Sequence, residues 1–123
     1  MAKLCQYGKQ LDSMTAQQVF DAACEHLLTQ NAKSLNSIDE DCIYNGNGVC
    51  CGAAPFIKEY HSDLDECALP WADVVEQGYA SSNHKSLIID IQHIHDRYNV
   101  YEWKIELLGL SEQYNLKFNE IKC

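Results

Sequence analysis

The sequence predicts an α+β fold: a mainly helical single domain, residues 1–123, with about four helices and one small β-hairpin. Capping signals precede apolar residues at helical spacing at several points along the chain. Asn and Gly residues cluster between two short apolar runs at one point. A length of 123 residues suits one hydrophobic core and is too short for two.

The first helix is predicted over residues 15–32. Thr15 and Gln18 have the spacing of a capping box, in which each side chain accepts a hydrogen bond from the other residue's backbone N–H. Apolar residues then recur at intervals of three and four, at Phe20, Ala23, Leu27 and Leu28. Cys24 lies within this pattern and is expected to act as a small buried hydrophobe.

The β-hairpin is predicted in the stretch "CIYNGNGVCC". Its central segment, Asn45 to Gly48, tolerates positive φ and is flanked by apolar residues. With this segment as the connection, Tyr44 opposes Val49 across the two strands. Alternation of side chains then sends Cys50 and Cys51 to opposite faces.

Three more helices are predicted in the second half of the chain. Pro70 and Gly78 frame a short helix that carries Trp71, Val74 and Val75. Ser82 or Asn83 is expected to cap the next helix, whose apolar stripe consists of Leu87, Ile88, Ile91, Ile94, His95 and Tyr98.

The last helix follows almost without a loop and makes an αα-hairpin with the one before it. Asn99 ends the preceding helix and forms a second capping box with Glu102. The apolar residues of the last helix are Trp103, Leu107, Leu110 and Tyr114. The tail "LKFNEIKC" is expected to be a short strand or an extended segment packed on the core.

The acidic charge is concentrated in the middle of the chain. The net charge is −9, and residues 36–80 carry nine acidic residues against Lys58 alone, which gives −8 for that third. Residues 1–35 sum to 0 and residues 81–123 to −1. Such an acidic block repels nucleic-acid backbones and anionic membranes and attracts basic protein surfaces. A solubilising role is the simpler interpretation of the same charge.

The N-terminal twenty residues lack the apolar run of a secretory signal, and no stretch is long enough to span a bilayer. We therefore expect a soluble protein in the cytoplasm. In that reducing compartment the seven cysteines are expected to remain thiols and to serve mostly as packing material.

Two chemical interpretations compete with a structural role for the cysteines. They are a zinc site and a thiol-dependent active site, both centred on Cys42, Cys50, Cys51 and His61. The spacing differs from the paired C-x2-4-C ligands of structural zinc sites, and acidic neighbours raise a thiol's pKa. The sequence thus favours no metal, no cofactor and no catalytic residue, with the enzyme as the alternative.

The "HIHD" stretch has the residue types of a metal site but not the geometry. His93 and His95 are two residues apart, so on a helix they point about 200° away from each other. We expect His95 to be a core or boundary histidine hydrogen-bonded to a neighbour and His93 to be exposed.

The stretches "CIYNGNGVCCGAAPFIKEYH", "PWADVVEQGY" and "IQHIHDRY" together resemble a family of small bacteriophage and bacterial proteins with no established activity. The resemblance covers roughly residues 15–115. Matching positions are Cys42, Tyr44, Gly46, Gly48, Cys50 or Cys51, Gly52, Tyr60, Ile94, His95 and Asp96. The family's turn usually contains a basic residue and a proline, where this chain has Asn45 and Asn47. The resemblance implies an origin in a phage or mobile element.

The leading functional hypothesis is a small acidic protein that inhibits or modulates a basic host protein, such as a nucleic-acid-binding one. It binds no nucleic acid directly, and inhibitors of host defence are one class that fits. Tyr44 at the hairpin is a suitable aromatic anchor, since Tyr is enriched at interface hot spots. The residues predicted at the contact surface are Asp39, Glu40, Asp41, Tyr44, Asp63, Asp65 and Glu66.

Overall fold

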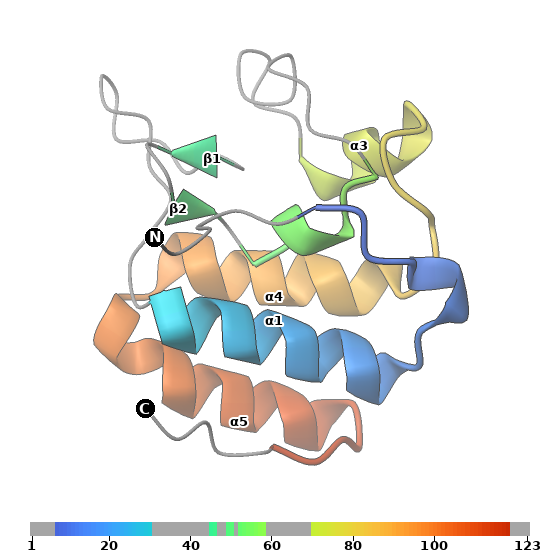
Figure 1. The fold of residues 1–123 in the computed structure, drawn as a ribbon. Helices are drawn as coiled ribbons and strands as arrows, with labels where there is room; N and C mark the ends of the chain where they lie inside the picture. Colours follow the sequence, from blue (N-terminus) through green and yellow to red (C-terminus); the bar gives the residue numbers. More distant parts are fainter. Residues whose placement is uncertain (1–6, 31–44, 47–48, 51, 59–69, 119–123) are drawn as a thin grey trace.

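The computed structural model describes residues 7–30, 45–46, 49–50, 52–58 and 70–118. Figure 1 shows three long helices side by side, and each contacts the other two: α1 (Ala16–Gln30), α4 (Lys85–Arg97) and α5 (Trp103–Gln113). Helices α1 and α4 run in the same direction, and α5 runs antiparallel to both (Figure 1). A short helix, α3 (Trp71–Glu76), packs on α4.

The predicted α+β class is wrong, because the described part of the chain is a helical fold. Its only strand pairing joins β1 (Asn45–Gly46) to β2 (Val49–Cys50), two residues each, and no sheet takes part in the core. Strands of folded proteins usually have three to ten residues. This pairing is therefore a tight turn rather than an element of an α+β domain.

The predicted register is also wrong. Asn45 pairs with Cys50 and Gly46 with Val49, whereas the prediction placed Val49 opposite Tyr44. The connection is thus two residues long instead of four.

The core is built around a segment with little regular structure, Gly52 to Ile57. Only a single 3-10 turn, η2 (Ala54–Phe56), interrupts its irregular backbone, and every one of its six residues is buried. A Cβ atom on Gly52 would lie 2.9 Å from Ile91 Cγ2 and 3.0 Å from Leu27 Cδ1. Glycine here lets the backbone approach α1 and α4 closely, which places the rest of the segment inside.

The first capping box is confirmed. The Thr15 backbone N–H donates to Gln18 Oε1 at 2.8 Å, and the Gln18 N–H donates to Thr15 Oγ1 at 3.1 Å. Helix α1 follows, with a buried face of Val19, Phe20, Ala23, Cys24 and Leu27. The predicted range of 15–32 extends beyond the described end at residue 30.

The helices α3, α4 and α5 match their predicted places, with two corrections. Tyr98, predicted in the apolar stripe of α4, is exposed and follows the helix as its C-cap. Pro70 precedes α3, and Gly78 follows it with φ +87°. The predicted Ser82 or Asn83 cap of α4 is wrong: His84 is the N-cap, without a side-chain capping bond. The Asn83 side chain instead donates to Asp12 Oδ1 at 2.9 Å. Asp12 is distant in sequence, and this contact occupies the side chain that would otherwise cap the helix.

The second capping box is confirmed at Asn99 and Glu102. Both reciprocal bonds are present, and a 3-10 turn, η3 (Val100–Glu102), leads directly into α5. Trp103, Leu107 and Leu110 form the buried face of α5, as predicted.

The described part of the predicted tail, residues 116–118, is not a strand, and Leu116 and Phe118 pack against the core. Phe118 meets Phe20 edge to face, with 6.3 Å between ring centroids. Gln17 of α1 binds the tail twice: its Nε2 donates to the Lys117 carbonyl at 2.8 Å, and its Oε1 accepts from the Lys117 N–H at 2.9 Å. Among the described helices, none has the length and apolar content that crossing a membrane requires.

Candidate functional site

The residues predicted to contact a partner lie outside the part of the chain that the structure describes. This holds for all seven: Asp39, Glu40, Asp41, Tyr44, Asp63, Asp65 and Glu66. Their predicted role stays a prediction. Of the nine acids in the 36–80 block, the described ones are Asp73, which is half-buried, and Glu76, which is exposed, both on α3.

The alternative cysteine centre is equally beyond the described residues. Cys42, Cys51 and His61 lie outside them, and Cys50 is described only as part of β2. Within the described residues, no group of three or more His, Cys, Asp or Glu side chains is close enough to hold a metal ion.

The described surface does carry an unexpected feature on α5 and the turn that precedes it. Three apolar side chains are exposed there: Tyr101 (80%), Ile105 (71%) and Leu108 (46%). Ile105 and Leu108 are three residues apart and lie along one line of the α5 surface, and Tyr101 lies in the 3-10 turn that precedes the helix. Glu112, also exposed, continues the line four residues later. We call these four residues the outer face of α5.

Helix α5 is therefore apolar on two opposite sides. Trp103 and Leu107 are fully buried against α1 and α4, while Ile105 and Leu108 between and beside them face outward. A surface helix of a globular protein normally has one apolar stripe and a polar opposite face. The exposed apolar side chains of α5 thus come in addition to its buried stripe.

Gly109 adds to the unusual character of this helix. It lies in the interior of α5, and a Cβ placed on it would meet no heavy atom within 4 Å. Glycine costs about 1 kcal/mol relative to alanine in a helix interior. Nothing in the described structure requires the missing side chain here.

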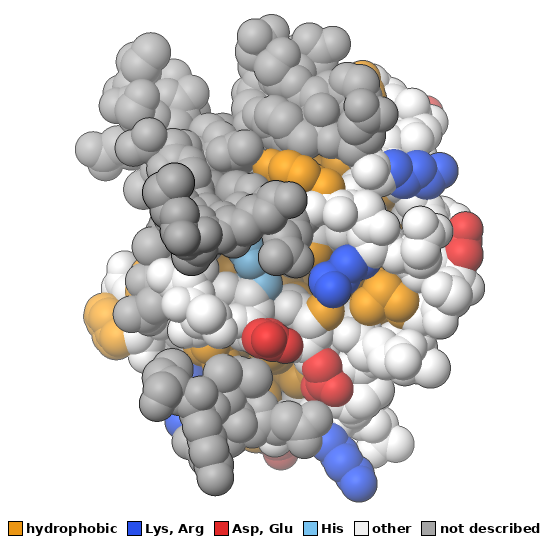
Figure 2. Space-filling view, viewed as in Figure 1, with side chains coloured by type: hydrophobic (Ala, Val, Ile, Leu, Met, Phe, Trp, Pro, Cys, Tyr) orange, Lys and Arg blue, Asp and Glu red, His pale blue; other side chains and the backbone are white. Residues whose placement is uncertain are grey.

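Charges of both signs surround the described helices. In Figure 2 the Lys and Arg side chains are interspersed with Asp and Glu side chains, and on this face neither sign gathers into a patch. On α5 itself, Lys104 is exposed beside the outer face and Glu106 is half-buried. The described residues hold six Lys and Arg against ten Asp and Glu, so this part of the chain carries a net charge of −4.

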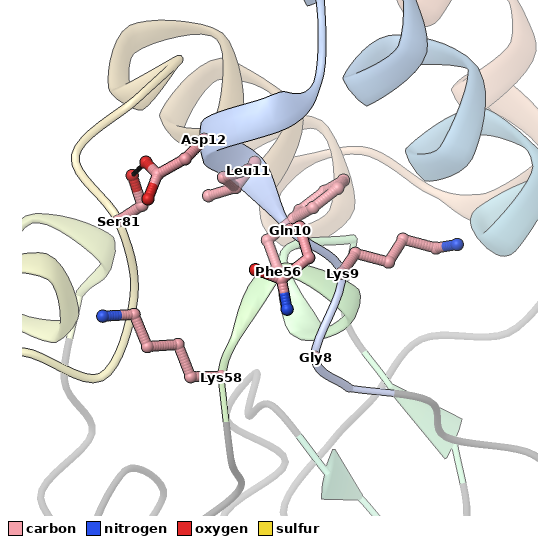
Figure 3. A pocket seen from close by; sticks show the side chains of 8 residues that line it. All are labelled: Gly8, Lys9, Gln10, Leu11, Asp12, Phe56, Lys58 and Ser81. Atoms are coloured by element: carbon pink, nitrogen blue, oxygen red, sulfur yellow. Dashed lines mark hydrogen bonds between the residues drawn. The ribbon is translucent and has the colours of Figure 1, made fainter.

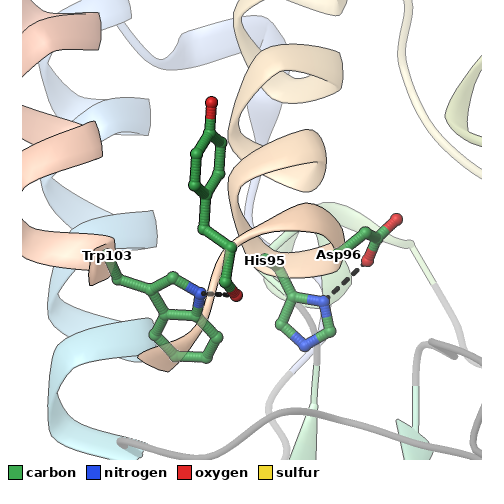
Figure 4. A network of polar contacts seen from close by, with 4 residues as sticks. His95, Asp96 and Trp103 are labelled. Atoms are coloured by element: carbon green, nitrogen blue, oxygen red, sulfur yellow. Dashed lines mark hydrogen bonds and ion pairs between the residues drawn. The ribbon is translucent and has the colours of Figure 1, made fainter. Parts of the chain in front are cut away.

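A buried histidine, His95, lies in the last turn of α4, next to the start of α5 (Figure 4). His95 is fully buried, stacks on Trp103 with 5.5 Å between ring centroids, and contacts Asp96 Oδ1 through Nδ1 at 2.8 Å. Since a carboxylate only accepts, Nδ1 carries the proton. The Trp103 indole in turn donates to the Tyr98 carbonyl at 3.3 Å. This confirms the expected core histidine, and His93 is exposed as expected.

The pocket shown in Figure 3 is a second place where charged and polar side chains lie close together. Its volume is about 210 Å³, and Lys9, Gln10, Asp12, Lys58 and Ser81 are among its lining residues. Asp12 Oδ1 accepts hydrogen bonds from Ser81 at 2.6 Å and from Asn83 at 2.9 Å. The two lysine side chains point in different directions (Figure 3), so they do not converge on one anion.

Two groups have strongly raised pKa values. Burial, with the charge of Asp21, raises the pKa of the Cys24 thiol to about 12, which leaves it protonated and unreactive. This fits the prediction that Cys24 serves as packing material. Desolvation, followed by the 2.6 Å hydrogen bond that Tyr114 donates to Asp90, raises the pKa of Tyr114 to about 12.

No protein family, curated protein or solved structure matches this chain. The resemblance to a phage and bacterial family therefore stays a prediction, and function has to be argued from the chain itself.

The outer face of α5 was not predicted from the sequence. Its signal was present, because the spacing of Tyr101, Ile105 and Leu108 is the same four-and-three interval that placed the buried side of the helix. Periodicity shows that apolar residues share a line on the helix, but it does not show which of two such lines is buried. The packing of α5 against α1 and α4 determines this.

Proposed function

We propose that this chain is a small acidic binding protein that inhibits or modulates a basic partner protein, of the kind that binds nucleic acid. The observation that carries the proposal is the uneven charge: −8 over residues 36–80 and −1 over the rest of the chain together. A block of one sign steers a partner of the opposite sign and repels wrong partners.

The described helices supply the packed core of the protein, and seven of the nine acids of the acidic block lie outside the described residues. Helices α1, α4 and α5 bury the core, and their surface charges are mixed (Figure 2). The described residues sum to −4 and the remaining residues to −5. The acids are densest within residues 36–80, and this concentration suits recognition of a basic surface better than an even distribution would.

The contact itself is proposed to combine charge and one aromatic anchor. The acids of the block compete with phosphate groups for the partner's Lys and Arg side chains. Tyr44 supplies apolar area together with a hydroxyl, the combination typical of interface hot spots. An inhibitor of a host defence protein is one form that such an activity takes.

The experiment compares two charge-reversed variants of equal net charge. Asp39→Lys/Asp63→Lys and Glu25→Lys/Glu106→Lys both change the net charge from −9 to −5, but only the first pair lies in the acidic block. Each variant and the native protein are used as bait in host-cell lysate at low and moderate salt, and retained proteins are identified by mass spectrometry.

We expect the native chain and the Glu25→Lys/Glu106→Lys variant to retain one basic protein. The Asp39→Lys/Asp63→Lys variant should lose it. Its retention should fall as salt rises, because the attraction is screened. If both variants lose the partner protein equally, net charge and not the acidic block is responsible for binding. If both variants retain it equally, Asp39 and Asp63 do not take part in the contact.

A further inference from the structure

Three stretches of the chain that are distant in sequence meet at the pocket shown in Figure 3, and backbone hydrogen bonds join them. The Lys9 N–H donates to the Pro55 carbonyl at 3.0 Å, and the Lys58 N–H donates to the Tyr79 carbonyl at 2.9 Å. The walls of the pocket are therefore fixed by the fold itself. Sites for small molecules are usually formed in this way before the ligand arrives.

Two side chains of opposite charge line this pocket. Asp12 Oδ1 accepts hydrogen bonds from Ser81 at 2.6 Å and from Asn83 at 2.9 Å, which hold the carboxylate in place. The Lys58 side chain points to the side of the pocket on which Asp12 and Ser81 lie (Figure 3). Within the residues that the structure describes, neither Asp12 nor Lys58 forms an ion pair. Both charges are thus open to a ligand.

The inner wall of the pocket is apolar and its volume is small. Leu11 and Phe56 line it, and both are buried. The volume is about 210 Å³. Because a water molecule takes about 30 Å³ of the liquid, the pocket holds a molecule of roughly six to nine non-hydrogen atoms. It is too small to enclose a nucleotide.

We propose that this pocket binds a free α-amino acid with a short aliphatic side chain, in its zwitterionic form. The ammonium group of the ligand donates to the Asp12 carboxylate, and the carboxylate of the ligand accepts from the Lys58 ammonium. The aliphatic side chain lies against Leu11 and Phe56. Each charge of the pocket gains a partner of opposite sign through a charge-assisted hydrogen bond.

Simple ions fit the same pocket less well. A phosphate ion would pair with Lys58 but would be repelled by Asp12, and a small cation would meet the reverse situation. Lys9 does not add a second positive charge at the same place, because its side chain points away from Lys58 (Figure 3). A ligand that carries both charges on one small apolar body is attracted by every wall.

The first test compares L-valine with two molecules that each lack one of its charges. Isovalerate has no ammonium group, and isobutylamine has no carboxylate. Binding is followed by NMR through the backbone amide signals of residues 8–12, Lys58 and Ser81 in the native, isotope-labelled chain. We expect saturable shifts with a Kd of about 1 mM for L-valine, since the ligand is small and the two charges are exposed. Each analogue should bind at least about tenfold more weakly, because it loses one charged hydrogen bond.

The second test removes each charge of the pocket in turn. Asp12→Asn and Lys58→Met should each weaken the binding of L-valine at least about tenfold. Isovalerate should bind Asp12→Asn at least as tightly as it binds the native chain, and isobutylamine should do the same with Lys58→Met. The matched controls are Glu112→Gln and Lys85→Met, which make the same charge changes at exposed positions of α5 and α4 and should bind L-valine normally.

Circular dichroism checks the fold of Asp12→Asn, because Asp12 also accepts two hydrogen bonds. Lys58→Met tests the site even if that variant is unstable, since the Lys58 side chain is exposed and only its backbone N–H bonds to Tyr79. Three results would each overturn the proposal: no saturable shift with L-valine at about 50 mM, isovalerate or isobutylamine binding as tightly as L-valine, or equal weakening in Lys58→Met and Lys85→Met. None of them bears on the acidic block, so the two proposals can fail separately.

Discussion

The segment Gly52 to Ile57 and the outer face of α5 are both apolar, yet one is the most buried part of the described chain and the other is exposed. The buried segment has almost no regular structure, whereas the exposed residues belong to a well-formed helix and its first turn. Regular secondary structure and burial are thus separate properties here. An irregular backbone is tolerated inside because its polar groups find partners.

These partners come from neighbouring segments of the chain. The Gly8 N–H donates to the Ile57 carbonyl at 2.7 Å, and the Lys9 N–H donates to the Pro55 carbonyl at 3.0 Å. Within the segment, the Phe56 N–H donates to the Ala53 carbonyl at 3.0 Å and the Ile57 N–H to the Ala54 carbonyl at 3.2 Å. Bonds to Gly8 and Lys9 and bonds of the 3-10 turn thus satisfy these backbone groups, which allows the side chains to be buried.

The largest expected difference comes from removing one large side chain from each region. Phe56→Ala leaves a cavity among buried side chains and should lower the free energy of unfolding by about 3–5 kcal/mol. Ile105→Ala removes exposed atoms and should change it by about 0.5 kcal/mol or less. Urea unfolding at low protein concentration measures both. Equal effects would mean that the two regions do not differ in burial.

A smaller but opposite pair of effects is expected at two glycines. Gly52→Ala forces a methyl group against Ile91 and Leu27 and should destabilise the chain by about 1–3 kcal/mol. Gly109→Ala enters open space in a helix and should stabilise the chain by about 1 kcal/mol. Thermal unfolding of the two variants should therefore shift the Tm in opposite directions. Shifts of the same sign would contradict the close approach at Gly52.

The start of α5 should depend on its cap. Asn99→Ala removes the capping box and should cost about 1 kcal/mol in urea unfolding. Ser82→Ala is the matched control, because Ser82 has the residue type of a cap while the structure assigns the N-cap of α4 to His84. Its effect should stay within about 0.5 kcal/mol. If Ser82→Ala lowers the free energy of unfolding as much as Asn99→Ala does, Ser82 caps α4 as the sequence predicted.

The smallest effect is expected from pH at the end of α5. The pKa of Tyr114 is about 12 in the folded chain and 10.0 as its ordinary value. A raised folded pKa means that the stabilisation is complete below pH 10 and is lost as the pH rises toward 12. Tyr114→Phe should remove this part of the pH dependence, measured by unfolding at several alkaline pH values. An unchanged dependence would show that Tyr114 does not carry it.

The sequence predicted the features that depend on neighbours along the chain. Both capping boxes are local arrangements of four residues, and the buried faces of α1, α4 and α5 repeat at helical intervals. Features that depend on distant contacts were missed or wrong. The Asn83 side chain bonds to Asp12 instead of capping α4, and the register of the β1–β2 pairing differs by two residues from the predicted one.

The functional residues divide in the same way. Composition is sufficient to locate an acidic block, so the proposed contact with a basic partner rests on sequence, and its seven residues stay predictions. The outer face of α5 required the fold, since only the packing of Trp103 and Leu107 inward turns Ile105 and Leu108 outward.

The paired hydrogen bonds between Gln17 and Lys117 have a consequence for the chain as it is synthesised. These bonds and the ring pair of Phe20 with Phe118 join parts of the chain about 100 residues apart. A ribosome releases the first helix long before the residues that cover it. During that interval the side of α1 that carries Phe20 lacks its final cover, so the nascent chain is open to misassociation until Lys117 and Phe118 emerge.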